Sequence, residues 1–348
     1  MMGDCYPKII LGQLYLIAFL YGFEMVKNLL VGVNITSPFQ LVCFVSYLKD
    51  RNDFFDEVIL YVVNYWGKGQ IYENYLSLLS GMNVDIRPVS SNRELISLVR
   101  RDIKSSYDVT FVCVNAPYFP FKLIKPKCKF VIVSDGLGTY NGLIKSINVS
   151  RKEKKINKLS FKFPLLIMKR LIVSFFYNIM SHEDYMLYNP RSLKKNNLFS
   201  SSLRETLKLF CSNNSGLGKP SLIFLSQPLV QLGILSKEEY WSCLNKAREL
   251  AKREELEFLI KLHPTEMAVF NSLDYTGIKK YDYNGLIEEA CVNDENIKVV
   301  VSFFSSGLYT VPELSNVRTY SVMSEGLFTS LNFSKKQKAI IKTVPSIK

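Results

Sequence analysis

The chain has 348 residues, of which 48% are hydrophobic and 13% aromatic, so it can bury a substantial core. These figures exclude a disordered, collagen-like or low-complexity protein. The 44 Lys and Arg residues outnumber the 31 Asp and Glu residues and leave a net charge of +13. That excess favours an anionic partner: nucleic acid, a membrane surface or a phosphorylated small molecule.

The metal-binding residue types are sparse. The seven cysteines are dispersed and form no CxxC pair, which is typical of reduced thiols in a cytoplasmic protein. His182 and His263 are the only histidines. Because the cysteines also lack the spacing of a zinc site, we expect no metal centre.

The sequence begins with an apolar segment. Residues 9–23 are 15 uncharged and mostly apolar residues between Lys8 and Glu24. They fall short of the roughly 20 residues that span a bilayer, and no convincing cleavage site follows them. We therefore expect residues 1–24 to form an apolar N-terminal extension, buried or interfacial, with Met25 as an alternative start.

Strand and helix patterns alternate after residue 25. Ser37 and Pro38 mark the start of one helix, and Ser91 with Glu94 forms a predicted capping box for another. The strands are expected at residues 29–34, 57–63, 83–89, 108–114 and 129–133, and a further helix at 70–79. This βαβ series predicts a parallel sheet with helices on both faces.

A second α/β series follows a polar segment. Residues 211–220 (CSNNSGLGKP) are the predicted linker, and Ser236 with Glu239 caps a helix predicted to end near residue 253. Strands are expected at residues 221–225, 256–262 and 298–302. We predict an α/β protein with two Rossmann-like domains, residues 25–210 and 211–348, that face a central cleft. Ligands of such sheets bind at the carboxyl ends of the strands.

Residues 151–171 mix basic and apolar side chains. Three interpretations stay open: a solvated surface helix, a membrane-surface contact, or a nucleic-acid patch. The apolar residues are aliphatic as often as aromatic, which favours a membrane over nucleic acid. The eight basic residues are Arg151, Lys152, Lys154, Lys155, Lys158, Lys162, Lys169 and Arg170.

Two strand ends carry groups suited to proton transfer. Asp135 follows an apolar strand and precedes Gly136, which lets the chain turn and a ligand approach, although ordinary turns also use Asp-Gly. His263 ends a later strand, which Pro264 stops. A histidine there is either a core residue or a donor to a phosphate and a proton donor near neutral pH.

A third strand end carries hydroxyl groups. Ser305, Ser306 and Gly307 follow a strand and precede a predicted helix. Hydroxyls and free N–H groups at a helix N-terminus form an anion site, and ordinary capping by serine is the alternative. The patterns GxGxxG and GxxxxGK[ST] are absent, so the sequence supports neither a dinucleotide site nor a P-loop.

Together these elements resemble the bacterial sialyltransferases, and most closely glycosyltransferase family 52, the lipooligosaccharide sialyltransferases. The Asp-Gly, His-Pro and Ser-Ser elements occur in order, with TSPFQL at 36–41 and IFLSQPL at 223–229. The resemblance extends over about residues 28–325. The chain departs from the family at Ser134, where one of two acidic residues is missing, and it carries about 24 extra residues at its front.

The resemblance implies a GT-B-like, inverting and metal-independent sialyltransferase that uses CMP-sialic acid and needs no cofactor. Asp135 is the implied general base, with Glu238 or Glu239 as the fallback, and His263 the group at the leaving phosphate or general acid. The implied donor-binding residues are Gln227, Pro264, Ser305, Ser306 and Gly307, and the acceptor-side residues are Ser37, Gln40 and Gly136.

The resemblance also implies partners. The expected acceptor is a lipid-linked bacterial surface glycan (lipooligosaccharide, O-antigen or capsule) that ends in galactose. The absence of an export signal and the basic aliphatic segments at 151–171 and near the C-terminus predict a peripheral protein on the cytoplasmic face of the inner membrane. The C-terminal basic residues are Lys335, Lys336, Lys338 and Lys342. We expect contact with the anionic membrane surface, no nucleic acid, and a homodimer as one possibility. The alternatives are another CMP-activated acid sugar, extension of a polysialic chain, or a non-catalytic glycan- or membrane-binding relative, which the missing carboxylate at Ser134 favours.

Overall fold

The computed structural model describes residues 26–63, 75–76, 79, 81–134, 136–141, 143, 147, 151, 160–180, 182–209, 216–263, 275, 277–331 and 333–347. The predicted extension 1–24 and most of the helix expected at 70–79 lie outside these residues, as does residue 25.

The first sheet has six strands in the order β3-β2-β1-β4-β5-β6, and every neighbouring pair is parallel. This is the strand order of the Rossmann fold, with its switch point between β1 and β4. The predicted strands are confirmed within two residues, and β6 is an addition to them. The strands are β1 (Lys27–Ile35), β2 (Glu57–Val63), β3 (Val84–Val89), β4 (Tyr107–Val114), β5 (Lys129–Val133) and β6 (Glu183–Tyr185).

Helices cover both faces of this sheet and bury its strands on both sides. Along β1, Leu29 and Val31 belong to one apolar cluster, and Leu30 belongs to the other. Helices α2 (Pro38–Asp50) and α8 (Asn197–Lys208) lie on one face, and α4 (Asn92–Asp102), α5 (Phe119–Ile124) and the end of α7 (Lys162–Ile179) on the other. The short helices are η1 (Asn52–Phe54) and η3 (Gly138–Tyr140). Among the described helices none is long and apolar enough to cross a membrane.

The helix starts mostly follow the predicted capping residues. Ser37 caps α2. The capping box expected for α4 is only half formed: Ser91 Oγ accepts from the N–H of Glu94, but the Glu94 carboxylate accepts from the N–H of Ser90 at 2.8 Å. The prediction was wrong for that second bond, because Ser90 offers the carboxylate both its N–H and its hydroxyl.

The second sheet has four parallel strands in the order β10-β9-β7-β8, which places its switch point between β7 and β9. Three of the strands were predicted, and β10 was not. The strands are β7 (Ser221–Leu225), β8 (Glu257–Lys261), β9 (Ile297–Ser302) and β10 (Arg318–Ser321). The helices are α9 (Lys237–Arg253), α11 (Ile287–Asn293), α12 (Gly307–Leu314), α13 (Glu325–Ser330) and α14 (Lys335–Ile341).

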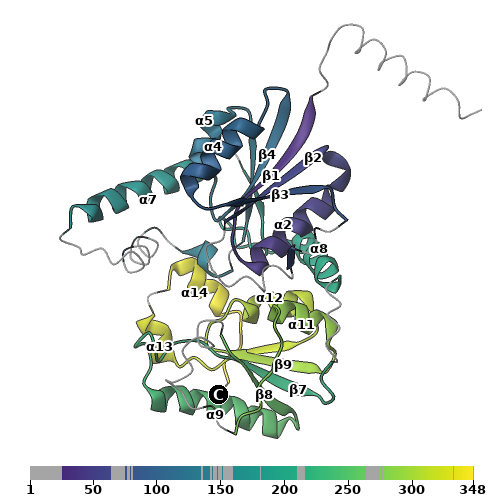
Figure 1. Cartoon of the computed structure of the whole chain (residues 1–348). Helices are drawn as coiled ribbons and strands as arrows, with labels where there is room; N and C mark the ends of the chain where they lie inside the picture. The colour runs from purple at the N-terminus through teal and green to yellow at the C-terminus, as the bar shows by residue number, and fades with distance from the viewer. Residues whose placement is uncertain are drawn as a thin grey trace, which may run out of the picture.

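One apolar cluster joins the two sheets. It combines residues of the first sheet, such as Val112, with residues of the second, such as Val300, and with α2, α8, α11 and α12. Figure 1 shows these helices between the sheets, α4 and α5 on the outer side of the first sheet, and α9 on the outer side of the second. The predicted α/β class and the GT-B-like pair of Rossmann-like units are confirmed.

Candidate active site

The carboxyl edge of the second sheet gathers His263, Gln227 and the residues after β9. The backbone N–H of His263 donates to the hydroxyl of Ser226 at 2.8 Å, which ties the end of β8 to the end of β7. The N–H of Phe304 donates to Gln227 Oε1 at 3.0 Å, so this side chain spans the switch point between β7 and β9. Burial lowers the pKa of His263, so its ring is neutral at pH 7 and can donate one N–H. Pro264 lies outside the described residues.

The two serines lie at the start of α12, as predicted. Ser306 occupies the N-cap position, but its side chain makes no capping hydrogen bond. The alternative interpretation, ordinary helix capping by the Ser306 side chain, is therefore not supported. Both Ser305 and Ser306 are half-buried, and α12 begins at Gly307 directly after them. Their hydroxyls and the first N–H groups of α12 are suited to an anion.

Gly136 brings the first sheet to this site. A Cβ atom added to Gly136 would lie 2.8 Å from Ser306 Cβ and 3.0 Å from Ser306 Oγ, so the backbone of Gly136 lies close against the side chain of Ser306. Gly136 also has a φ of 64°, which a residue with a side chain rarely adopts. Asp135 lies outside the described residues, but both of its neighbours are described. The hydroxyl of Ser134, at the position of the missing carboxylate, accepts from the N–H of Gly136 at 3.1 Å and shapes the turn.

Helix α14 holds the loop that follows Gly136. The side-chain amide of Gln337 donates to the carbonyl of Leu137 at 3.0 Å and to Asn141 Oδ1 at 2.8 Å. The hydroxyl of Ser334 donates to the carbonyl of Tyr140 at 2.7 Å. Gln337 is buried, so these bonds are shielded from water. The end of the chain therefore fixes a loop of the first domain.

Ser37 and Gln40, two of the predicted acceptor-side residues, have side chains that stabilise the start of α2. They form a capping box at the start of α2, in which Gln40 Oε1 also accepts from the N–H of Thr36 at 2.8 Å. Gln40 is buried. Their place after β1 agrees with the switch point of the first sheet, and contact with an acceptor stays a prediction.

The fallback bases, Glu238 and Glu239, lie in the first turn of α9, the helix on the outer side of the second sheet (Figure 1). Both are exposed, and the Glu239 carboxylate accepts from the N–H of Ser236 at 2.8 Å. Hydrogen bonds from its own N–H and from Ser236 lower the pKa of Glu238 and make it a weaker base. This geometry does not favour either residue as the general base.

Sequence reasoning missed a buried charged cluster beside the serines. Glu288 accepts from Thr310 Oγ1 at 2.6 Å, and Thr310 lies one turn after Ser306 on α12. Lys261, the last residue of β8, donates to the carbonyl of Tyr283. Burial lowers the pKa of Lys261 to about 8, although Glu289 and Glu288 act in the opposite direction.

Glu289 connects this cluster to the first domain. Its carboxylate accepts from the hydroxyls of Tyr75 and Tyr283, and the Tyr75 hydroxyl accepts from the N–H of Leu286 at 2.7 Å. Burial raises the pKa of both Glu288 and Glu289. A signal was present in the sequence: Lys261 directly follows the apolar residues 258–260, and the two adjacent glutamates begin an otherwise uncharged helix.

We expect Glu288→Gln to change the pH dependence of stability. Burial raises the folded-state pKa of Glu288 above its ordinary 4.5, so its contribution is present below pH 4.5 and lost as the pH rises through the folded pKa. Glutamine does not titrate and can still accept from Thr310. The difference in melting temperature, variant minus wild type, should therefore increase from pH 5 to pH 8. The increase should be about 2 °C for each unit by which the folded-state pKa of Glu288 is raised. Glu249→Gln, at an exposed position of α9, is the control, and an equal pH response of both variants contradicts the assignment.

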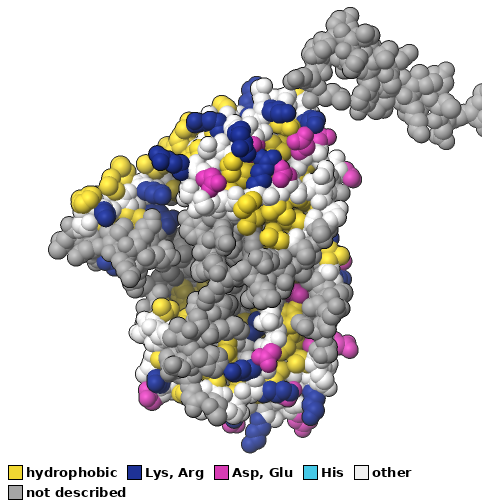
Figure 2. Space-filling view, viewed as in Figure 1, with side chains coloured by type: hydrophobic (Ala, Val, Ile, Leu, Met, Phe, Trp, Pro, Cys, Tyr) yellow, Lys and Arg dark blue, Asp and Glu magenta, His cyan; other side chains and the backbone are white. Residues whose placement is uncertain are grey.

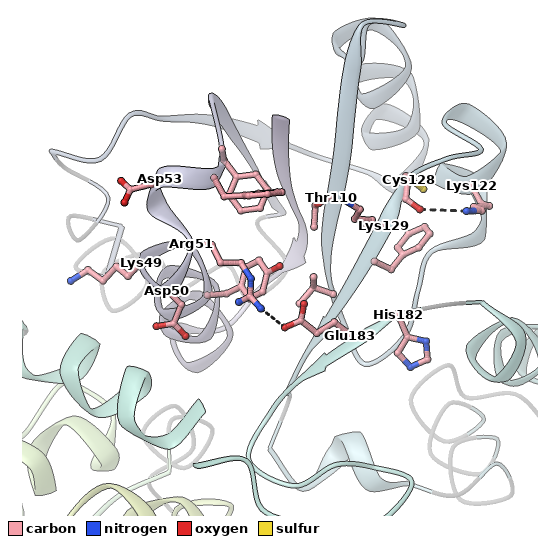
Figure 3. Close-up of a pocket in the computed structure, with 15 residues that line it drawn as sticks. Lys49, Asp50, Arg51, Asp53, Thr110, Lys122, Cys128, Lys129, His182 and Glu183 are labelled. Atoms are coloured by element: carbon pink, nitrogen blue, oxygen red, sulfur yellow. Dashed lines mark hydrogen bonds and ion pairs between the residues drawn. The ribbon is translucent and has the colours of Figure 1, made fainter. Parts of the chain in front are cut away.

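A separate pocket of about 810 Å³ lies at the opposite edge of the first sheet (Figure 3). Its lining includes Lys129 and Glu183, the first residues of β5 and β6. Several of its charges pair with one another or with nearby groups, as in the Arg51–Glu183 ion pair at 2.7 Å. Ligands of open α/β sheets bind at the carboxyl ends of the strands, so this pocket is not the candidate active site.

A metal site is not apparent in the part of the chain that the structure describes. No three His, Cys, Asp or Glu side chains among these residues come together in a way that could hold a metal ion. The described groups that follow the strands of the second sheet or lie beside α12 are a neutral histidine, two serines, a helix N-terminus and buried carboxyl groups.

The sequence matches a family model over residues 88–324, and its description is "Alpha-2,8-polysialyltransferase (POLYST)". The chain belongs to the alpha-2,8-polysialyltransferase family. The matched residues include Asp135, His263, Ser305 and Ser306. Membership supports transferase activity, and sialyl transfer in general, as the activity of this polysialyltransferase relative. The resemblance to glycosyltransferase family 52 stays a prediction, and no curated protein is similar enough in sequence to give a significant match.

Solved structures of sugar-processing enzymes share the arrangement of this polysialyltransferase-family chain. An α/β-galactoside α-2,3-sialyltransferase from Photobacterium phosphoreum is 14% identical, with a TM-score of 0.46 and coverage of 93% of this chain and 99% of that one. A putative UDP-N-acetylglucosamine 2-epimerase from Listeria monocytogenes is 13% identical, with a TM-score of 0.48 and coverage of 92% and 82%. A family 9 glycosyl transferase from Veillonella parvula is 9% identical, with a TM-score of 0.40 and coverage of 92% and 96%. At these scores the likeness carries no conclusion about the chemistry of this chain.

Proposed function

We propose that this chain is an inverting, metal-independent sialyltransferase that moves sialic acid from CMP-sialic acid to the terminal sugar of a bacterial surface glycan. Galactose is the proposed acceptor sugar. The observation that carries the proposal is the close approach of Gly136 to Ser306. It joins the Asp-Gly element, which follows the first sheet, to the proposed phosphate site at the start of α12. We further propose that the enzyme works on the cytoplasmic side of the inner membrane, where a lipid-linked acceptor is available.

The proposed reaction is a single displacement at the anomeric carbon of sialic acid. The acceptor hydroxyl oxygen forms a bond to that carbon as the bond to the CMP phosphate oxygen breaks, and the proton of the hydroxyl passes to Asp135. The neutral ring of His263 donates a hydrogen bond to the leaving phosphate, and this bond strengthens as negative charge develops there. Base and leaving-group stabiliser thus come from different domains.

The donor phosphate is proposed to bind at the start of α12. The hydroxyls of Ser305 and Ser306 and the first N–H groups of the helix offer hydrogen bonds and a positive dipole end. CMP carries one phosphate, so less charge must be neutralised than for a nucleoside diphosphate sugar. Turnover is therefore expected to persist in EDTA.

Calorimetric titration of CMP tests the donor site. His263→Ala should bind CMP more weakly and transfer sialic acid more slowly, and Ser306→Ala should bind CMP about 10-fold more weakly through the loss of one hydrogen bond to a charged group. His182→Ala, which changes the other histidine, is the control. Unchanged affinity and turnover of His263→Ala would remove His263 from the site.

A second candidate is extension of a polysialic chain, which the matched family description favours. The donor chemistry would be the same, and only the acceptor would differ. Incubation with CMP-sialic acid and either a galactose-terminated or a sialic acid-terminated oligosaccharide separates the two by chromatography of the products. A non-catalytic binding protein would release no CMP with either acceptor, and none from CMP-sialic acid alone.

A further inference from the structure

Helix α7 presents an apolar stripe to solvent. Its spacing along the sequence alternates between four and three residues, which places the side chains on one face of a helix. Their exposed fractions lie between 45% and 75%, which is high for large apolar groups. The stripe consists of Phe161, Leu165, Met168, Ile172, Phe175 and Ile179.

Side chains outside the stripe attach α7 to the protein. Leu166 is buried, and the ring of Phe176 stacks on Phe119 of α5 with 3.9 Å between ring centroids. Near the end of the helix, the Tyr177 hydroxyl donates to Asp184 Oδ1 at 3.2 Å. The helix projects from the side of the first domain (Figure 1). Its orientation is therefore fixed, with the stripe turned outward.

The charges beside the stripe are all positive. Residues 160–182 contain no Asp or Glu, and Lys162, Lys169 and Arg170 are their basic residues. Lys162 and Lys169 are separated by seven residues, so they line the same edge of the stripe. Figure 2 shows apolar side chains along this projection with Lys and Arg side chains beside them. An apolar face with a cationic edge is complementary to an anionic lipid surface.

A second copy of the chain is a poorer match for the same face. Pairing two α7 helices would bring lysines of both copies to one interface, and the helix has no acidic residue to pair with them. Lipid headgroups of negative charge supply the missing partners, and the acyl boundary accommodates the aliphatic and aromatic side chains.

We propose that α7 docks the protein on an anionic membrane surface, with the stripe inserted at the boundary between headgroups and acyl chains. The helix lies flat on the bilayer, because its inner face is held against α5 and β6. This interaction is independent of the proposed reaction and would hold for a protein that transfers no sugar.

Flotation of the full chain with lipid vesicles tests the proposal. Wild type should bind vesicles that contain phosphatidylglycerol and bind pure phosphatidylcholine vesicles less. Leu165→Gln/Ile172→Gln/Phe175→Gln should weaken binding about 100-fold or more through lost apolar burial. Lys162→Gln/Lys169→Gln should weaken binding to the anionic vesicles about fivefold for each lysine and leave binding to neutral vesicles unchanged. The apolar residues 9–23 remain in every variant, so a difference reports the stripe.

The matched control is Leu198→Gln/Leu232→Gln, which changes two leucines that are 77% and 64% exposed outside the stripe. It should bind as wild type does. Unaltered vesicle binding of the stripe variant, with a retained melting transition, overturns the proposal. So does sedimentation equilibrium that shows a wild-type dimer in the absence of lipid and a monomeric stripe variant, because α7 would then be a subunit interface.

Discussion

Asp135→Asn is expected to lower kcat by about 10²–10⁴ while it leaves CMP affinity nearly unchanged, because general-base catalysis contributes that factor. Asparagine keeps the size of the side chain and removes its ability to accept the proton of the acceptor hydroxyl.

The Asp135 prediction is measured by steady-state turnover, with CMP titration in parallel. Asp53→Asn, at an exposed position remote from the cleft, controls for the loss of one negative charge. Wild-type turnover in Asp135→Asn would assign the base to another group. A large loss of CMP affinity would instead indicate that Asp135 holds the donor.

Gly136→Ala is expected to abolish most transfer activity. The new Cβ would lie 2.8 Å from Ser306 Cβ, and no flexible side-chain end is available there to move aside. The φ of 64° adds a cost of about 1–2 kcal/mol for a residue with a side chain. The loop must therefore move away from α12, and the proposed base, Asp135, would be displaced from the proposed donor site.

Gly81→Ala separates the effect of the close contact with Ser306 from the cost of a positive φ. Gly81 also has a positive φ, of 91°, but a Cβ there would meet nothing within 4 Å. Both variants should lose similar stability through the backbone cost, and only Gly136→Ala should lose activity. Equal turnover of the two variants would show that the contact with Ser306 has no part in catalysis.

The secondary structure was largely predictable because the sheet strands are buried on both faces. After their polar first residues, Glu57 and Ser221, β2 and β7 are continuous apolar runs, and their bounds are as predicted. β6 and β10 were missed because they are only 3 and 4 residues long and include the charged residues Glu183, Asp184 and Arg318. Strands so short at a sheet edge carry no periodic signal.

The candidate site was predictable only within each domain. Parallel strands end at the same edge, so His263 and Ser306 could be placed at that edge of the second sheet from the sequence, although β7 lies between the strands that they follow. The contact of Gly136 with Ser306 depends on how the two sheets dock, and local pattern does not encode docking. The link between Tyr75 and Glu289, 214 residues apart, was unpredictable for the same reason.

The bonds from α14 to the loop after Gly136 have a consequence for synthesis on the ribosome. Gln337 and the Leu137 carbonyl that it holds are 200 residues apart in the sequence. At about 5–20 residues per second, translation delivers Gln337 about 10–40 seconds after Leu137. A nascent first domain can form its six-stranded sheet in that time but has no α14 to fix its loop. Translation therefore sets a delay of this length before the loop after Gly136 can gain its hydrogen bonds from α14, and chains cut short before residue 337 lack them.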